Sequence, residues 1–169
     1  GESNLNNPQV YKRLFPAMVR SWRKEWNQGE FPFYYVQIAP YDYGRKNADK
    51  TEAAEIRQVQ LECLKEIPNA GMVVTADIGN RTCVHPSDKE SVGKRLALWA
   101  LAKTYQRSGT PYSGPLYKSF TIDKEKIIVE FDYAEMGMTS YDREIVGFEI
   151  AGKDGIYYPA KAVLFDNKT

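Results

Sequence analysis

This chain of 169 residues lacks most of the features that mark specialised classes of protein. It has one histidine and two cysteines, Cys63 and Cys83, at spacings that indicate neither a disulfide framework nor a metal site. We therefore expect two free thiols, no metal and no other cofactor. Lys and Arg number 23 against 22 Asp and Glu, without a long basic run, which argues against a nucleic-acid partner.

Long apolar stretches are also missing. None approaches the roughly 20 residues of a membrane-spanning helix, so we expect no membrane partner. The first residues carry neither a basic nor an apolar region, so any targeting signal was removed or was never on this piece. What remains, 43% hydrophobic, 27% charged and 13% aromatic residues, is typical of one soluble globular domain, or one domain with a small appendage.

The first predicted element is a helix from Pro8 to about Trp26. Asn7 is a good N-cap residue and proline suits the first helical position. Pro16 removes a backbone donor inside this pattern and should kink or divide the helix. Three tryptophans lie on helical apolar stripes and are predicted to be core residues: Trp22, Trp26 and Trp99.

Two nearly continuous apolar runs, residues 31–39 and 71–79, are typical of strands covered on both faces in a parallel sheet. A helix over 51–67 lies between them, and a capping box that begins at Ser87 starts a further helix to about Tyr105. The order strand, helix, strand, helix predicts an α/β unit with right-handed crossovers.

The composition and the spacing of apolar residues change near residue 110. A segment rich in Pro, Gly and Ser is followed by apolar residues that alternate with period two around turns at 123–125 and 153–155. We therefore predict an α/β domain over 1–110 and a small antiparallel β unit, truncated at its end and without a catalytic group, over 111–169.

In an α/β unit, chemistry gathers at the carboxyl ends of the strands. The only histidine, His85, is predicted to lie there, in the loop before a helix N-terminus. Such a terminus disfavours imidazolium, so a histidine that accepts a proton there needs a carboxylate, and Asp77 at the end of its strand is the nearest candidate. From spacing alone, a neutral surface histidine is the simpler interpretation.

Several blocks, in order and spacing, resemble the sialate O-acetylesterase family of SGNH-type carbohydrate esterases. They are GESN (1–4), YKRLFPAMVRSWRKEW (11–26), PFYYVQIAPY (32–41), GMVVTADIG (71–79), VHPSDKESVGKRLALWAL (84–101), SGPLY (113–117) and VGFEIAG (146–152). The resemblance implies part of an SGNH-hydrolase, flavodoxin-like three-layer fold with a parallel sheet. It also implies an internal fragment that lacks the half bearing the nucleophilic serine.

The resemblance also assigns roles to residues. His85 matches the general base of the family. Gly1, Glu2 and Asn4 fall on a block that forms the oxyanion and substrate pocket, and Ser3 in the same block is not expected to be the nucleophile. Family members often carry the triad acid two or three residues before the histidine. Cys83 and Thr82 occupy these positions here. Asp77 remains the candidate acid, unless the acid lies upstream or the enzyme uses a Ser-His dyad.

The implied activity is removal of O-acetyl groups from sialic acid, of the 9-O-acetyl type, by the full-length protein. This chain alone is expected to be inactive, because its partner in catalysis is the missing N-terminal half. Two alternatives stay open: an acetylxylan or other carbohydrate acetylesterase, and a noncatalytic carbohydrate-binding or interaction module. The aromatic loop at 41–45 is a candidate surface for stacking the acetylated sugar. By resemblance, we expect a periplasmic or secreted protein.

Overall fold

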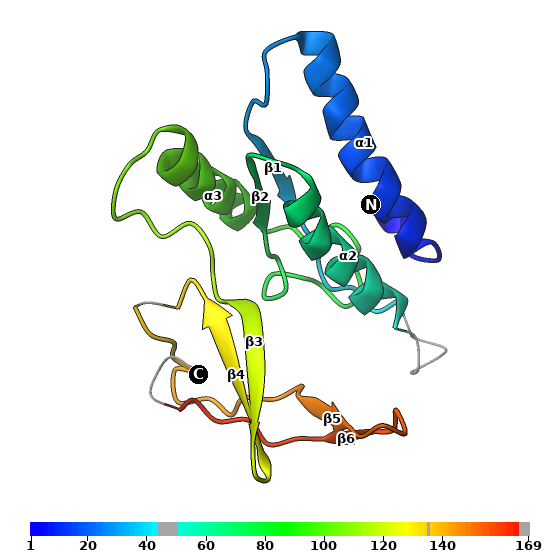
Figure 1. The fold of residues 1–169 in the computed structure, drawn as a ribbon, viewed down its shortest axis with the longest axis vertical. Helices are drawn as coiled ribbons and strands as arrows, with labels where there is room; N and C mark the ends of the chain where they lie inside the picture. The colour runs from blue at the N-terminus through cyan, green and yellow to red at the C-terminus, as the bar shows by residue number, and fades with distance from the viewer. Residues whose placement is uncertain (44–50, 135, 166–169) are drawn as a thin grey trace. The chain divides into compact units, whose positions relative to one another are not determined.

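The chain forms two compact units, Gly1–Tyr112 and Ser113–Thr169, in the computed structural model (Figure 1). The structure describes residues 1–43, 51–134 and 136–165. The division between the units falls two residues after the predicted position. None of the helices in these described ranges combines the length and apolar character that crossing a bilayer requires.

The first unit is an α/β layer built on two parallel strands. β1 (Phe33–Val36) and β2 (Ala70–Val73) pair in register from Phe33 opposite Ala70 to Val36 opposite Val73. The two strands run parallel, and both are shorter than the apolar runs in the sequence. Ahead of them come the short 3₁₀ turn η1 (Glu2–Asn4) and the long helix α1 (Pro8–Trp26).

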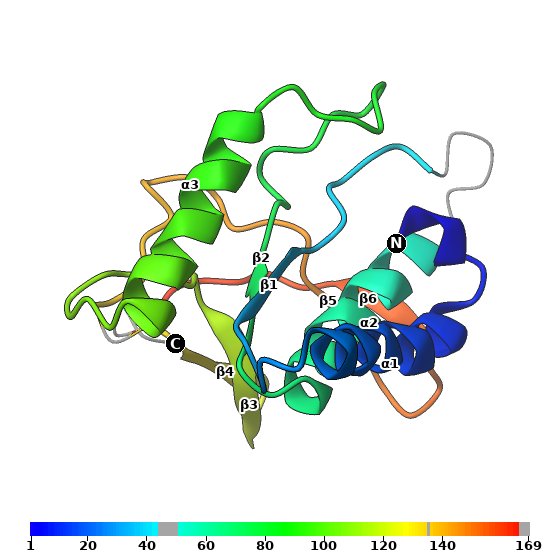
Figure 2. The same ribbon diagram turned by 90° about the horizontal axis from the view of Figure 1, so that it is seen from above.

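Helices cover both faces of this strand pair. α2 (Glu52–Glu66) joins β1 to β2 and packs beside α1, whereas α3 (Lys89–Trp99) lies on the opposite side of the strands (Figure 2). A π-helical turn, η2 (Ala100–Thr104), extends α3 to almost the predicted end of the helical run. The result is a layer of two helices, a layer of strands and a layer of one helix.

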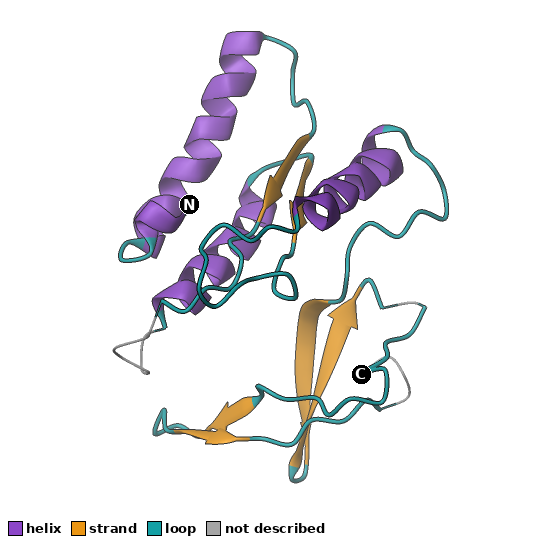
Figure 3. Cartoon of the chain, turned by 180° about the vertical axis from the view of Figure 1, so that it is seen from behind, coloured by secondary structure: helices purple, strands orange, loops and turns teal. Residues whose placement is uncertain are grey.

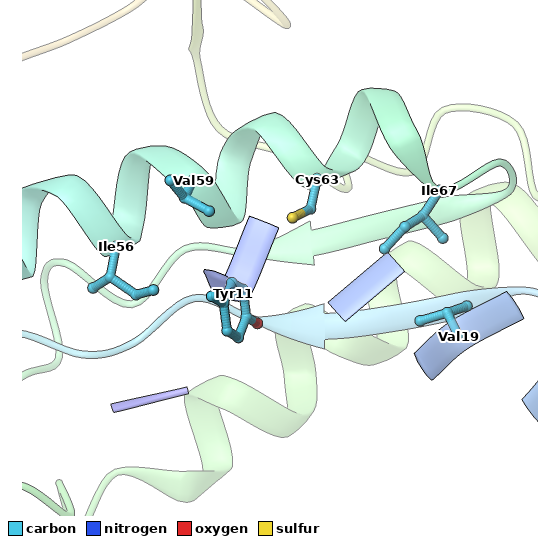
Figure 4. Close-up of a cluster of buried hydrophobic side chains, with 6 residues drawn as sticks. All are labelled: Tyr11, Val19, Ile56, Val59, Cys63 and Ile67. Carbon is cyan, nitrogen blue, oxygen red and sulfur yellow. The ribbon is translucent and has the colours of Figure 1, made fainter. Parts of the chain in front are cut away.

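The core of the first unit lies between α1, α2 and one face of the strands. Its buried members come from α1, α2 and the turn after α2: Tyr11, Val19, Ile56, Val59, Cys63 and Ile67 (Figure 4). Phe15 of α1 extends this cluster to β1, since its ring meets the rings of Phe33 and Tyr35 edge-on. The apolar stripe of α2 therefore faces the core.

The prediction for the tryptophans is right for one and wrong for two. Trp99 is buried, but Trp22 is 48% and Trp26 is 65% exposed. These two lie at the flank of the buried stripe of α1, where Trp22 contacts the ring of Phe33 and Trp26 stacks on Phe31. The periodicity of α1 located its apolar residues, but a stripe this wide is only partly covered by α2 and the strands.

The helices differ from the prediction at their N-caps and at Pro16. Asn7 occupies the N-cap of α1 without a side-chain hydrogen bond, and α1 continues through Pro16 as one helix. At α3 the cap is Asp88, whose carboxylate accepts from the backbone N–H of Ser91 at 2.9 Å, and not Ser87. The predicted capping box was therefore one residue out of register.

The second unit consists of antiparallel pairs, as predicted (Figure 3). β3 (Leu116–Asp123) pairs with β4 (Lys126–Asp132), and β5 (Glu149–Ala151) pairs with β6 (Tyr157–Pro159). Lys124 turns the first hairpin with φ 54°.

Candidate active site

A pocket opens where the chain leaves the carboxyl ends of β1 and β2. It has a volume of about 290 Å³ and is open to solvent. The loop after β1 and the loop after β2 supply its lining residues: Pro40, Tyr41, Asp42, Ala76, Asp77, Gly79, Asn80 and Arg81. This is the edge of an α/β sheet at which ligands bind as a rule, and Asp77, a predicted site residue, lines it.

Backbone hydrogen bonds hold the two loops together. The N–H of Asn80 donates to the carbonyl of Pro40 at 3.1 Å, and the N–H of Asp42 donates to the carbonyl of Arg81 at 3.3 Å. Gly79 lies so close to Pro40 that a Cβ would overlap the carbonyl oxygen and the ring of that proline. The shape of the pocket therefore depends on a glycine at this position.

Buried polar side chains secure the bases of these loops. Thr75 donates from its hydroxyl to the carbonyl of Gln37 at 2.9 Å, and Gln37 donates from Nε2 to the carbonyl of Arg57 at 2.9 Å. Gln60, on α2, accepts from the N–H of Ile38 through Oε1 at 3.0 Å. Because buried polar groups are costly when unpaired, these bonds fix where each loop starts.

His85 lies in an exposed loop between β2 and α3, as predicted. Asn80 orders the chain before it, because Oδ1 accepts from the N–H and hydroxyl of Thr82 and from the N–H of Cys83 at 2.8, 3.0 and 3.0 Å. The Cys83 thiol donates to the backbone carbonyl of His85 at 3.2 Å. Cys83, like Cys63, is a free thiol.

Asp77 has a different partner from the predicted one. Both of its carboxylate oxygens accept hydrogen bonds from Arg95 of α3, at 2.7 Å for Oδ1 and 2.5 Å for Oδ2. This bond to the guanidinium is the main cause that lowers the pKa of the Asp77 carboxyl below its ordinary value. Among the side-chain hydrogen bonds of the described residues, none joins Asp77 to His85. The contact seen for Asp77 is thus an ion pair with Arg95.

The first block of the sequence is connected to the loop after β1. The hydroxyl of Tyr43 donates to Oε1 of Glu2 in η1, and its ring meets that of Tyr41 edge-on, with centroids 4.9 Å apart. Partial burial, followed by the bond to Glu2, raises the pKa of Tyr43 above its ordinary value. Ser3 is exposed on the same short turn, which is not a strand-to-helix elbow.

The other predicted residues of this block, Gly1 and Asn4, belong to the same turn, with Gly1 exposed and Asn4 half-buried. The aromatic loop at 41–45 is described only as far as Tyr43, so its last two residues lie outside the described part. No group of three His, Cys, Asp or Glu residues suited to a metal ion occurs within the described ranges.

Sequence reasoning did not predict the contacts of three residues that organise this region: Arg95, Asn80 and Tyr43. Asn80 had a detectable signal, since the side chain of asparagine commonly bonds to the backbone two residues ahead in turns. The contact of Tyr43 with Glu2 spans 41 residues, and no local pattern encodes it.

Comparison with known proteins places this geometry in a family. The chain is 30% identical to the sialate O-acetylesterase of Rattus norvegicus over 151 residues, which cover 79% of this chain and 27% of that protein. It is 31% identical to the sialate O-acetylesterase of Homo sapiens over 150 residues, which cover 79% of this chain and 28% of that protein. The chain thus spans about a quarter of the length of these curated relatives.

A solved structure gives the same result for the fold. The crystal structure of a carbohydrate acetylesterase from Xanthomonas citri matches with a TM-score of 0.90 and 33% sequence identity, over 99% of this chain and 39% of that one. No protein-family model matches the chain. On the similarity to these named esterases, over most of its own length and a part of theirs, this chain belongs to the sialate O-acetylesterase family.

Proposed function

We propose that the protein containing this chain is a serine carbohydrate esterase that removes O-acetyl groups, and that this chain supplies the histidine side of its active site. One observation carries the proposal. In a relative of named acetylesterases, the loop that follows the carboxyl end of β2 contributes to an open pocket and then carries the only histidine of the chain.

The reaction requires a nucleophile, which we place outside this chain. A serine hydroxyl from another part of the protein would attack the acetyl carbonyl carbon while His85 takes its proton. The histidine would then pass that proton to the departing sugar oxygen, as the bond between that oxygen and the acetyl carbon breaks. Water, deprotonated in turn by His85, would release acetate from the acyl-enzyme and restore the serine.

Other residues fit supporting roles in this proposal. Gly1, Glu2 and Asn4 would belong to the oxyanion and substrate pocket, and the bond from Tyr43 to Glu2 gives their turn a fixed attachment. Tyr41 lines the pocket with an aromatic ring on which a sugar could stack. The parallel strands with helices on both faces would form part of an SGNH-type, flavodoxin-like sheet.

For the substrate we propose an O-acetylated sialic acid, with the acetyl group at the 9-position. Sialate appears in the names of the curated relatives, which supports this choice. The solved neighbour, a carbohydrate acetylesterase, equally supports a second candidate, an acetylxylan or other acetylated sugar. We further propose that the full protein is exported to the periplasm or secreted, which fractionation of the native cells would test.

The test is acetate release by the full-length protein from 9-O-acetylated sialic acid, acetylated xylan and an activated aryl acetate. We expect turnover with His85 intact, and a loss of kcat of about 10⁴-fold or more in His85→Ala, as for removal of a general base. Exposed Lys94, which pairs with Glu90 on the outer face of α3, provides the matched control Lys94→Met with unchanged kinetics.

The isolated chain is expected to release no acetate above background. Full activity in His85→Ala would contradict the assignment of the base. A full-length protein that binds these sugars and hydrolyses none of them would instead favour the noncatalytic carbohydrate-binding module. An isolated chain as fast as the full protein would place the nucleophile within these residues, with Ser3 the first to be tested.

A further inference from the structure

One face of α3 follows the edge of β2 that points away from β1. Trp99 donates from its indole N–H to the carbonyl of Met72 at 3.1 Å, and Arg95 donates from Nη1 to the carbonyl of Val74 at 2.7 Å. The neighbouring carbonyl, that of Val73, instead accepts from Gln37 next to β1. Alternate carbonyls of β2 thus point to β1 and to α3, as the geometry of a strand requires.

The spacing of the two side chains along α3 matches the spacing of the two carbonyls along the strand. Residues four apart on a helix share a face and are about 6 Å apart along its axis, and residues two apart on a strand are about 6.6 Å apart. Trp99 and Arg95 therefore bond to the outward carbonyls of Met72 in β2 and of Val74 directly after it, without distortion of either element. This double contact fixes how far α3 slides along the strand, and with it the position of the loop that connects them.

Arg95 also reaches past the end of β2. Its Nη1 bonds to Oδ1 of Asp77 at 2.7 Å and its Nη2 to Oδ2 at 2.5 Å, so one guanidinium holds the carbonyl of Val74 and both carboxylate oxygens. A planar guanidinium suits this bidentate arrangement, which the single ammonium of lysine cannot reproduce. The side chain of Arg95 is 33% exposed and that of Asp77 is 63% exposed, so the pair contributes to geometry more than to stability.

From Asp77 a short series of contacts leads to the histidine. Gly79 and Asn80 meet Pro40 across the pocket, and Asn80 accepts from the N–H of Cys83, two residues before His85. At the other end of the loop, Asp88 caps α3. The loop is thereby attached to α3 on both sides of His85, through Arg95 at its start and Asp88 at its end.

We propose that Arg95 is a positioning residue of the esterase site: by holding Asp77 and the carbonyl of Val74, it sets the loop that lines the pocket and carries His85. Asp77 then acts as the acceptor for Arg95 and not as the carboxylate that orients the histidine. The ion pair explains why Asp77 lies at this strand end although no hydrogen bond among the described residues joins it to His85. This inference rests on the esterase function proposed above.

The experiment uses the full-length protein and four variants: Arg95→Met, Arg95→Lys, Asp77→Asn and the double variant Arg95→Met with Asp77→Asn. For each, kcat, KM, the pH profile of kcat/KM and the thermal midpoint are measured, with Lys94→Met as the control. A second measurement, amide hydrogen exchange over residues 76–85 without substrate, reports the order of the loop independently of any activity.

We expect Arg95→Met and Asp77→Asn each to lower kcat by about 10- to 100-fold, the range for a misplaced catalytic group, with a KM within a few-fold of wild type. The double variant should be no slower than the slower single variant, because both remove the same contact. Arg95→Lys should recover part of the rate, and hydrogen exchange over 76–85 should rise in both single variants. The acid limb of the pH profile should not move.

Other results would overturn the proposal. If Asp77 orients His85 directly, Asp77→Asn alone should lower kcat and shift the acid limb, while Arg95→Met, which frees the carboxylate, should be as fast as wild type or faster. That outcome, or losses that add in the double variant, overturns the proposal. If the wild-type protein releases no acetate, the esterase function fails, and the hydrogen exchange still decides whether Arg95 holds the loop.

Discussion

The indole ring of Trp99 occupies the space where a side chain at Gly71 would begin. A Cβ at this glycine of β2 would meet Cδ2 of the ring at 2.6 Å, and the ring cannot retreat, because its N–H is bonded to the carbonyl of Met72. We therefore expect Gly71→Ala to lower the free energy of unfolding by about 1–3 kcal/mol through overpacking. Urea and thermal unfolding of the full-length protein would measure this loss.

A second glycine provides the matched control. Gly93 lies in α3, and a Cβ there would have no heavy atom within 4 Å. Because alanine suits a helix interior better than glycine, Gly93→Ala should raise the free energy of unfolding by about 0.5–1 kcal/mol. Equal effects of Gly71→Ala and Gly93→Ala would mean that α3 does not pack on β2 as described.

The two cysteines should differ in reactivity. Cys63 is buried in the core, where burial is the main cause that raises the pKa of its thiol to about 11, whereas Cys83 is exposed in the loop before His85. Because the thiolate is the reactive form, Cys83→Ser should remove one fast-reacting thiol from the native protein at pH 8. Cys63→Ser should change the count only after unfolding, and a fast reaction of Cys63 in the native protein would contradict its burial.

The cap of α3 should leave a signature in the pH dependence of stability. Hydrogen bonds from Ser91 lower the pKa of the Asp88 carboxyl below its ordinary value of 3.8, so the ionised form stabilises the folded state. This contribution is fully present above pH 3.8 and is lost as the pH falls through the lower pKa of the folded state. The thermal midpoint of wild type should therefore exceed that of Asp88→Asn most clearly above about pH 4, with the gap closing on acidification.

Ser87→Ala distinguishes the cap seen in the structure from the one predicted from the sequence. Because Asp88 accepts the bond from Ser91, removal of the Ser87 hydroxyl should leave the thermal midpoint almost unchanged, while Asp88→Ala should lower it. A larger loss of thermal midpoint in Ser87→Ala than in Asp88→Ala would instead support the predicted capping box.

The difference in thermal midpoint between wild type and Asp88→Asn should also shrink in high salt, because Asp88 is at the surface.

The patterns that are local in sequence predicted the fold well. Helical spacing gave α1 with the bounds seen in the structure, and apolar runs gave the parallel strands β1 and β2. The wrong assignments of the two tryptophans depend on what covers a surface. Trp22 and Trp26 continue the apolar stripe of α1, but periodicity cannot tell how much of that stripe a neighbouring helix reaches.

The site was harder to predict for a related reason. His85 and Asp77 were identified from their place at a strand end and before a helix, and the structure places both in the same loop region. Their partners were not predictable, because an aspartate can pair with any cation that the fold brings near. The bond from Arg95 to Asp77 spans 18 residues and depends on the position of α3 along β2, which the sequence pattern does not specify.

The pocket itself can be tested at Gly79. Alanine there would force apart the loops that follow β1 and β2, because the new Cβ would overlap the carbonyl oxygen of Pro40, a backbone atom that cannot move alone. We expect Gly79→Ala in the full-length protein to lower kcat/KM by about 10- to 100-fold, since the pocket-lining residues would shift by a fraction of an ångström or more. The thermal midpoint should also fall, because the overlap is with backbone and ring atoms of Pro40 that cannot move aside cheaply. Gly114→Ala, where a Cβ meets nothing within 4 Å, is the control with unchanged kinetics. A Gly79→Ala protein with wild-type kcat/KM on every acetylated sugar tested would show that the reaction takes place away from this pocket.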